Sequence, residues 1–238
     1  MASFARFDSR PALNRPVLVA GLPGVGSVGR IAAGLMVEQL SAKRIACFYS
    51  TDLPSTVETN ELNVMKAPCY SLWLVRCDRG DVIFLTGDHQ ATSIQGQMSL
   101  TEDVFRTVLE HDPSLVIAVG GCYVEEPAEE PRILGAVTDP EMKPFFAMNG
   151  VQFVPGEPKG GISGMNGALM TLCEAYGVDA LCLMAETPGP FEDRKGAGAV
   201  VEALTRILGT RVDCSSLSKD KPAEQEKEPR EDLDPPYF

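Results

Sequence analysis

The sequence predicts an α/β domain in which helices cover both faces of a mainly parallel sheet. Apolar runs that do not alternate with polar residues are typical of parallel strands buried on both faces, and they occur at 17–20, 115–119 and 180–184. Segments with apolar residues at helical spacing separate such runs, as at 97–111 and 194–208. Strands that alternate with helices favour one layered domain, residues 15–212, after an N-terminal segment of residues 1–14.

The composition limits the function. The chain has 238 residues, 44% hydrophobic and 23% charged, which suits one large core and leaves too little for a second full domain. The formal net charge of −12 argues against nucleic acid as a partner, because no stripe of lysine and arginine is present to meet the phosphates. The start lacks the apolar stretch of a signal peptide, and no run approaches the roughly 18 apolar residues that span a bilayer. We expect a cytoplasmic protein with no membrane contact.

The domain begins with a strand, a glycine loop and a helix. Residues 17–20 form the predicted strand, and the helix starts near Ser27. A second strand is predicted at 44–50, and Pro54 stops any helix after it. This arrangement places the first glycine loop at the carboxyl end of a buried strand.

Local signals also define the next three elements. The segments 70–77 and 81–86 are predicted to pair as a hairpin, because the turn Asp78-Arg79-Gly80 joins them. The helix that occupies 97–111 is ended by Asp112-Pro113.

The second half continues the alternation of strands and helices. Strands are predicted at 115–119, 133–137, 151–154 and 180–184. Helices are predicted to start near Pro140 and to occupy 165–176 and 194–208. Gly177 and Gly209 supply the stop signals of the last two helices.

Two glycine loops open helices and are candidate ligand sites. The first contains Gly24, Gly26, Ser27 and Gly29 and spells G-x-G-x-x-G, a pattern that can hold a phosphate group. The second contains Gly160, Gly161, Ser163 and Gly164. Two features favour packing glycines over a nucleotide site: Asp52 lies farther on than the usual 20 or so residues, and a Walker A lysine is missing. A nucleotide or phosphate ligand stays as the alternative.

The sequence predicts no catalytic residues, metal or cofactor. A long helical segment separates His89 from His111, and neither has a second ligand at metal spacing. The seven cysteines are scattered through apolar runs without C-x-x-C, as expected for small buried hydrophobes. Acidic residues near strand ends could form an acid/base pair, but carboxylates are abundant in this chain; they are Asp88, Glu125, Glu126 and Glu186.

The C-terminal residues 213–238 differ sharply from the rest. They are rich in charge and proline and poor in aliphatic residues, so we expect a disordered, flexible tail. The last three residues, Pro236, Tyr237 and Phe238, place two aromatics at the end of this polar segment. A solvated tail gains nothing from aromatics, which favours a docking role for them.

Seven motifs, in order along residues 15–210, resemble the archaeal members of the PAC2 proteasome-assembly-chaperone family. They are GLPGVGSVGRIAAGLMVEQL from Gly21, DLP at 52–54, NEL at 60–62, TGDHQ at 86–90, PRILGAVTDPE at 131–141, GGISGMNGALM at 160–170 and ETPG at 186–189. Each motif alone is modest, and their common order makes the resemblance specific.

The resemblance implies a phosphorylase/hydrolase-like α/β fold, a homo-oligomer, and neither catalytic residues nor a cofactor. It also implies a C-terminal hydrophobic-tyrosine-any motif that inserts between α subunits of the 20S proteasome ring, here at Pro236, Tyr237 and Phe238. Pro236 departs from the larger aliphatic residue usual at its position. We therefore expect an ATP-independent assembly chaperone or α-ring binding protein, not an enzyme. The alternatives are a nucleotide- or phosphate-binding enzyme or sensor, and an oligomeric scaffold with a different partner.

Overall fold

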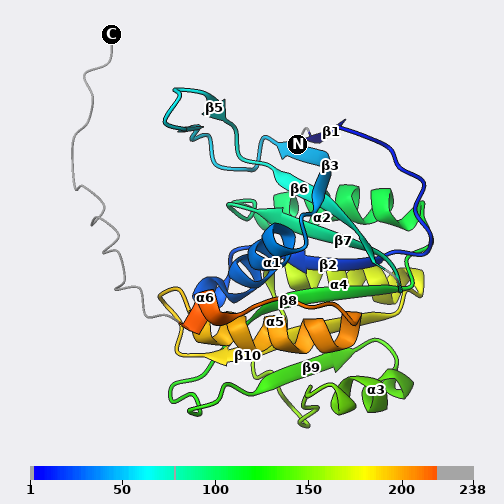
Figure 1. The fold of residues 1–238 in the computed structure, drawn as a ribbon, viewed down its shortest axis with the longest axis vertical. Helices are drawn as coiled ribbons and strands as arrows, with labels where there is room; N and C mark the ends of the chain where they lie inside the picture. Colours follow the sequence, from blue (N-terminus) through cyan, green and yellow to red (C-terminus); the bar gives the residue numbers. More distant parts are fainter. Residues whose placement is uncertain (1–2, 78, 219–238) are drawn as a thin grey trace.

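The computed structural model describes residues 3–77 and 79–218. An eight-stranded sheet crosses the molecule in the order β1-β3-β6-β7-β2-β8-β10-β9 (Figure 1). Its strands are β1 (Ser3–Phe7), β2 (Val17–Gly21), β3 (Lys43–Ser50), β6 (Tyr70–Cys77), β7 (Gly80–Gly87), β8 (Leu115–Tyr123), β9 (Ile133–Val137) and β10 (Ala180–Thr187). The helices are η1 (Val25–Ser27), α1 (Val28–Gln39), α2 (Ile94–Leu109), η2 (Pro140–Met142), α3 (Lys143–Met148), α4 (Gly164–Tyr176), α5 (Arg194–Leu208) and α6 (Ser215–Ser218).

The sheet is parallel at its centre and antiparallel at its flanks. Strands β7, β2, β8 and β10 pair in parallel. The hairpin of β6 and β7, the pairing of β3 with its two neighbours and the pairing of β9 with β10 are antiparallel. The predicted α/β class and the predicted hairpin are confirmed.

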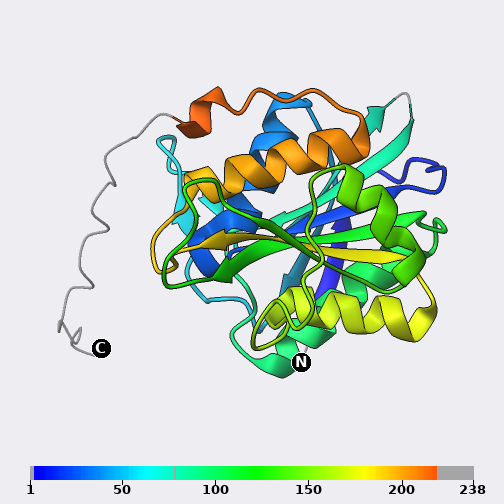
Figure 2. The ribbon, with the colours of Figure 1, turned by 90° about the horizontal axis from the view of Figure 1, so that it is seen from below.

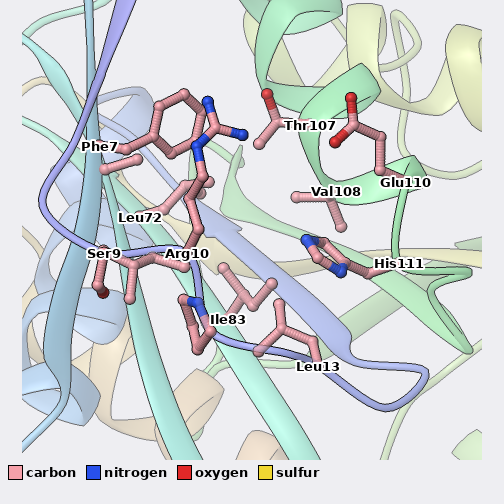
Figure 3. Close-up of a pocket in the computed structure, with 13 residues that line it drawn as sticks. Phe7, Ser9, Arg10, Leu13, Leu72, Ile83, Thr107, Val108, Glu110 and His111 are labelled. Atoms are coloured by element: carbon pink, nitrogen blue, oxygen red, sulfur yellow. The ribbon is translucent and has the colours of Figure 1, made fainter.

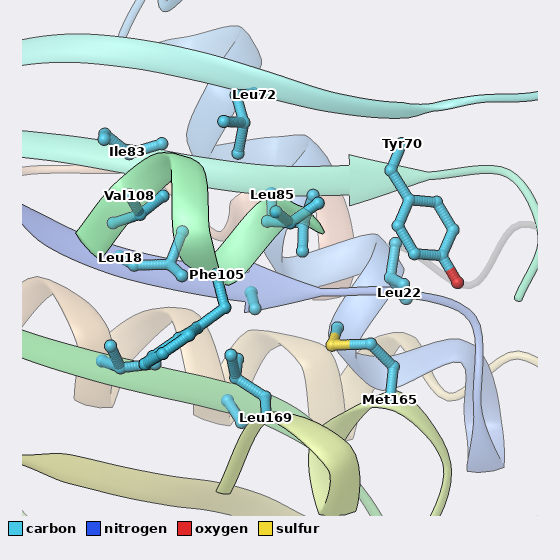
Figure 4. Packing of buried hydrophobic residues seen from close by; sticks show 14 of the residues in the cluster. Leu18, Leu22, Tyr70, Leu72, Ile83, Leu85, Phe105, Val108, Met165 and Leu169 are labelled. Carbon is cyan, nitrogen blue, oxygen red and sulfur yellow. The ribbon is translucent and has the colours of Figure 1, made fainter. Parts of the chain in front are cut away.

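Helices cover both faces of the sheet, as predicted. Helices α2 and α4 pack on one face, and α1 and α5 pack on the other (Figure 2). Figure 4 shows the first of these two cores, where Phe105, Val108, Met165 and Leu169 meet side chains of the central strands. The continuous apolar runs of the central strands follow from this double cover, because side chains on both faces are buried.

Two segments beside the main sheet differ from the expectation. Strand β1 pairs with β3 along the whole of Ser3–Phe7, although its sequence carries no strong strand signal. The strand predicted at 151–154 is wrong: the segment makes only an isolated bridge between Leu134 and Gln152.

A small two-stranded arm, β4 (Glu58–Thr59) and β5 (Met65–Lys66), projects from the domain (Figure 1). The Asn60 side-chain oxygen shapes its turn by accepting hydrogen bonds from the backbone N–H groups of Leu62 and Val64, at 3.0 and 2.9 Å.

Among the helices of the described residues, none has the length and apolar character to cross a membrane.

Candidate functional site

The first glycine loop lies at the carboxyl end of β2 and is packed against protein. Gly26 has a φ of 62°, and a Cβ built on it would lie 2.7 Å from the hydroxyl oxygen of Thr187. A Cβ on Gly29 would overlap the carbonyl oxygen of Val119 in β8. Close packing at both positions, together with the positive φ of Gly26, therefore accounts for glycine there.

Gly24 and Ser27 are placed differently. Gly24 is exposed and has an extended φ of −168°, and the nearest atom to a Cβ on it would be Gln90 Nε2 at 3.9 Å. Ser27 precedes α1 with a φ of 48°, and its side chain caps no helical N–H. Neither packing nor backbone conformation requires glycine at position 24.

Gln90 brings the two glycine loops together. Its Nε2 donates a hydrogen bond to the carbonyl oxygen of Pro23 in the first loop. Its Oε1 accepts a hydrogen bond of 3.1 Å from the backbone N–H of Met165, in the first turn of α4. A Cβ on Gly164 would lie 3.0 Å from the same Oε1. The two loops that the sequence singled out therefore share one edge of the sheet.

The rest of the second loop is exposed. Gly160 and Gly161 have φ values of 81° and 79°, a conformation that favours glycine, and no atom lies within 4 Å of a Cβ on either residue. Ser163 precedes α4, and its side chain caps no N–H. This part of the loop is shaped by its backbone and not by close packing.

No hydrogen bond or ion pair among the described residues joins two of the four acidic residues near the strand ends, so they do not form an acid/base pair. Glu186 is buried, with 3% exposure, and pairs with Arg132, whose guanidinium also lies 3.4 Å from Glu157. Asp88 pairs with Lys66 at 2.7 Å, while Glu125 and Glu126 are exposed. A buried carboxylate held by arginine serves structure, because the ion pair compensates its desolvation.

The cysteines are free thiols, and four of them, Cys47, Cys69, Cys173 and Cys182, are buried. Burial raises the pKa of Cys173 and of Cys182 to about 12, so these thiols stay protonated at neutral pH. No group of three or more potential metal ligands occurs within residues 3–77 and 79–218.

A cavity of about 100 Å³ lies away from the glycine loops, between residues 7–13, the strands β3, β6 and β7, and the end of α2 (Figure 3). Its wall is mainly apolar, and the guanidinium of Arg10 lies 3.7 Å from the ring centroid of Phe7 at its mouth. None of the residues that the sequence singled out as ligand-binding lines this cavity.

Three contributors to the glycine-loop edge were not predicted as site residues: Gln90, Thr187 and Arg132. Each belongs to a motif that the sequence displays, but each acts on residues more than 50 positions away in the chain. The sequence marked them in two ways, by their place in these motifs and by their position near the ends of predicted strands. The predicted docking residues Pro236, Tyr237 and Phe238 lie outside the described residues.

These features define a single α/β domain in which the two glycine loops meet at the carboxyl ends of the parallel strands in the centre of the sheet. The chain belongs to the PAC2 family, whose model matches residues 18–228.

Solved structures and a relative agree with this assignment. PbaB of Pyrococcus furiosus, described as an archaeal proteasome activator, is 29% identical with a TM-score of 0.84, over 91% of this chain and 93% of that one. PbaA of the same organism, described as an archaeal homologue of proteasome-assembly chaperone, is 22% identical with a TM-score of 0.76, over 90% of both chains. The uncharacterized protein MJ1210 of Methanocaldococcus jannaschii is 28% identical over 87% of this chain and 79% of its own length.

Proposed function

We propose that this chain is an ATP-independent proteasome-assembly chaperone or activator that works as a binding protein and not as an enzyme. The observation that carries the proposal is the similarity to PbaB, at 29% identity and a TM-score of 0.84 over nearly the whole chain. Membership in the PAC2 family supports it. Glu186 is paired with Arg132, and the buried thiols of Cys173 and Cys182 are protonated, so these groups are not available for acid/base or nucleophilic catalysis.

The partner in this proposal is the α ring of the 20S proteasome, reached through Pro236, Tyr237 and Phe238. The Tyr237 ring enters a pocket between α subunits, and its hydroxyl finds a hydrogen-bond partner there. The terminal carboxylate of Phe238 pairs with a lysine of the pocket. A cytoplasmic homo-oligomer would present several such tails to a ring of equivalent pockets, which raises the effective concentration of each tail.

Binding to isolated α-subunit rings tests the tail. Tyr237→Ala should weaken the affinity of the full chain at least tenfold, about 1.4 kcal/mol. Leu233→Ala is the matched control, because it removes an apolar side chain from the same segment outside the motif, and it should bind like the wild type. Pro236→Leu should bind more tightly than the wild type, since it supplies the larger apolar side chain. Equal binding by the Tyr237→Ala and wild-type chains would refute the tail mechanism.

The competing function is a nucleotide or phosphate ligand at the glycine loops. One observation favours it: Gly24 is exposed, and packing does not explain its glycine. A ligand present at 100 times its dissociation constant should stabilise the fold by about 2.7 kcal/mol. The thermal midpoint should therefore rise with a nucleotide or inorganic phosphate if this function holds, and it should stay constant if the loops only pack.

A further inference from the structure

Three loops at the carboxyl edge of the sheet are tied together around Thr187. The Thr187 backbone carbonyl accepts a hydrogen bond of 3.0 Å from Val124, just after β8. Its hydroxyl faces Gly26 of the first glycine loop, and the carbonyl oxygen of Gly26 accepts a hydrogen bond of 2.8 Å from the backbone N–H of Asp193. The loops around Val25, after β8 and before α5 therefore form one connected surface.

This surface exposes three apolar side chains, which we call the edge patch: Val25, Tyr123 and Phe191. They are 43%, 60% and 79% exposed. The Tyr123 ring packs over Gly189, where an added Cβ would lie 2.8 Å from the ring, and Phe191 follows two residues later. Exposed aromatic side chains on loops that hydrogen bonds hold in place are typical of the centre of a protein interface.

An acidic loop borders the edge patch. It follows Tyr123 and Val124 directly and carries four exposed carboxylates, Glu125, Glu126, Glu129 and Glu130. In the described part of the chain none of the four forms an ion pair. The Lys195 ammonium donates a hydrogen bond to the backbone carbonyl of Glu129, so one cation also lies beside this loop. The four exposed carboxylates next to an apolar centre still complement a partner surface that carries lysine or arginine beside an apolar depression.

Helix α6 lies near the same patch. Helix α6 is fixed to the start of α5, because Arg194 donates a hydrogen bond of 2.8 Å to the carbonyl oxygen of Ser216, and the buried Leu217 lies close to Gly198. Phe191 lies three residues before Arg194. Figure 1 shows α6 at the side of the molecule where β8 and β10 end. Ser218, the last described residue, therefore lies on the side of the molecule that carries the patch.

We propose that the edge patch is a second docking surface, on the folded domain, for the partner that the C-terminal residues engage. This inference rests on the proposed function and adds a contact to it. The occupant is a basic surface of the α ring with an apolar centre, which meets Tyr123 and Phe191 while the tail enters its pocket. A two-fold contact between two copies of the patch would bring identical acidic loops together, so like-charge repulsion opposes a second copy as the occupant.

The matched variants are both made in the full chain. Tyr123→Ser with Phe191→Ser removes the aromatic part of the patch. Phe145→Ser with Met148→Ser is the control, because α3 carries these residues at the opposite edge, 48% and 80% exposed. Circular dichroism and thermal unfolding establish that both variants fold before the binding of each to isolated α-subunit rings is measured.

The patch variant should bind the ring at least tenfold more weakly, and the control should bind like the wild type. Changing the four glutamates of the acidic loop to glutamine should weaken binding and reduce its dependence on salt, because fewer charges meet the partner. A chain that ends at Leu233 should keep weak binding, and the patch variant of that shorter chain should lose it.

Three results would overturn the inference. If the patch variant binds like the wild type while Tyr237→Ala binds weakly, the tail function stands and the patch has no part in it. If the patch variant changes the mass of the oligomer and leaves ring binding unchanged, the patch joins copies of this chain. If the wild-type chain does not bind the ring at all, the proposed function and the docking surface are both wrong.

Discussion

The Oε1 atom of Gln90 accepts a hydrogen bond of 3.1 Å from the backbone N–H of Met165, while Nε2 of the same amide donates to the carbonyl oxygen of Pro23. One side chain thus fixes the spacing of two loops that are far apart in the sequence. Gln90→Ala removes both bonds and leaves two backbone groups without their partner. We expect the free energy of unfolding to fall by about 2–3 kcal/mol in urea titrations.

Gln90→Glu is the matched comparison for that experiment. It keeps an acceptor for Met165 but places a second oxygen against the carbonyl of Pro23. It should therefore also destabilise the protein, chiefly through the first loop. A Gln90→Ala protein as stable as the wild type would show that the amide does not fix the two loops.

Two glycines of α1 should respond in opposite ways to alanine. Gly29→Ala forces a Cβ into the carbonyl oxygen of Val119, so it should lower the free energy of unfolding by about 1–3 kcal/mol. Gly34 is exposed on the same helix with no atom within 4 Å of a Cβ, so Gly34→Ala should raise it by about 0.5–1 kcal/mol. Thermal unfolding of both variants measures the difference, and equal effects would contradict a packing role for Gly29.

Removing only the arginine of the Arg132–Glu186 ion pair should destabilise the protein more than replacing both partners with apolar residues. Arg132→Met leaves the buried Glu186 without its cation, so we expect the free energy of unfolding to fall, by less than for a fully buried pair because the Arg132 side chain is 36% exposed. Arg132→Met combined with Glu186→Leu should recover part of that loss. A double-mutant cycle in urea measures the coupling, and additive single effects would argue against it.

Stability should fall in alkaline solution. Burial raises the pKa of Tyr70, Cys173 and Cys182 to about 12, from ordinary values of 10.0 for tyrosine and 9.0 for cysteine. Between about pH 9 and 12 the unfolded chain releases protons that the folded chain keeps, so the free energy of unfolding decreases as pH rises. Below about pH 8 these groups are protonated in both states and contribute almost no pH dependence.

Each of these groups can add a slope of up to about 1.4 kcal/mol per pH unit. Cys182→Val should reduce the slope of the free energy of unfolding against pH between about pH 9 and 10.5 in urea titrations, and it should leave that slope unchanged between about pH 6.5 and 7.5. A slope unchanged by this substitution would show that Cys182 ionises as easily in the folded state as in the unfolded chain.

Elements with strong local signals could be predicted from the sequence. Helix α5 spans Arg194–Leu208 as expected, because its apolar residues recur at helical spacing and Gly209 ends it with a φ of 67°. The first residues of β8 form an apolar run that is buried, as expected for a strand covered on both faces. Strand β1 could not be predicted, because Ser3–Phe7 becomes a strand only through its pairing with β3.

The candidate site could be predicted only in part. The glycine pattern identified Gly26 and Gly29, but the atoms that approach them belong to Thr187 and Val119, and no local pattern encodes that proximity. Likewise, the sequence placed polar residues after β7 without indicating that Gln90 would link two loops. The edge patch follows from tertiary contacts among three loops, which a single sequence does not reveal.

The two ends of the sheet differ in how they resist unwanted strand addition. On the outer side of β9, the backbone carbonyl of Gln152 accepts a hydrogen bond of 2.9 Å from the backbone N–H of Gly135 and so occupies part of that edge. Strand β1 has no outer neighbour in the described part of the chain, but it is only five residues long and carries the exposed Arg6, and both features discourage edge-to-edge aggregation. A chain without residues 3–7 would instead present β3 as its edge, eight residues long with Ile45–Phe48 buried at present. We therefore expect the N-terminal strand, by covering β3, to lower the tendency of this sheet to aggregate through its edge.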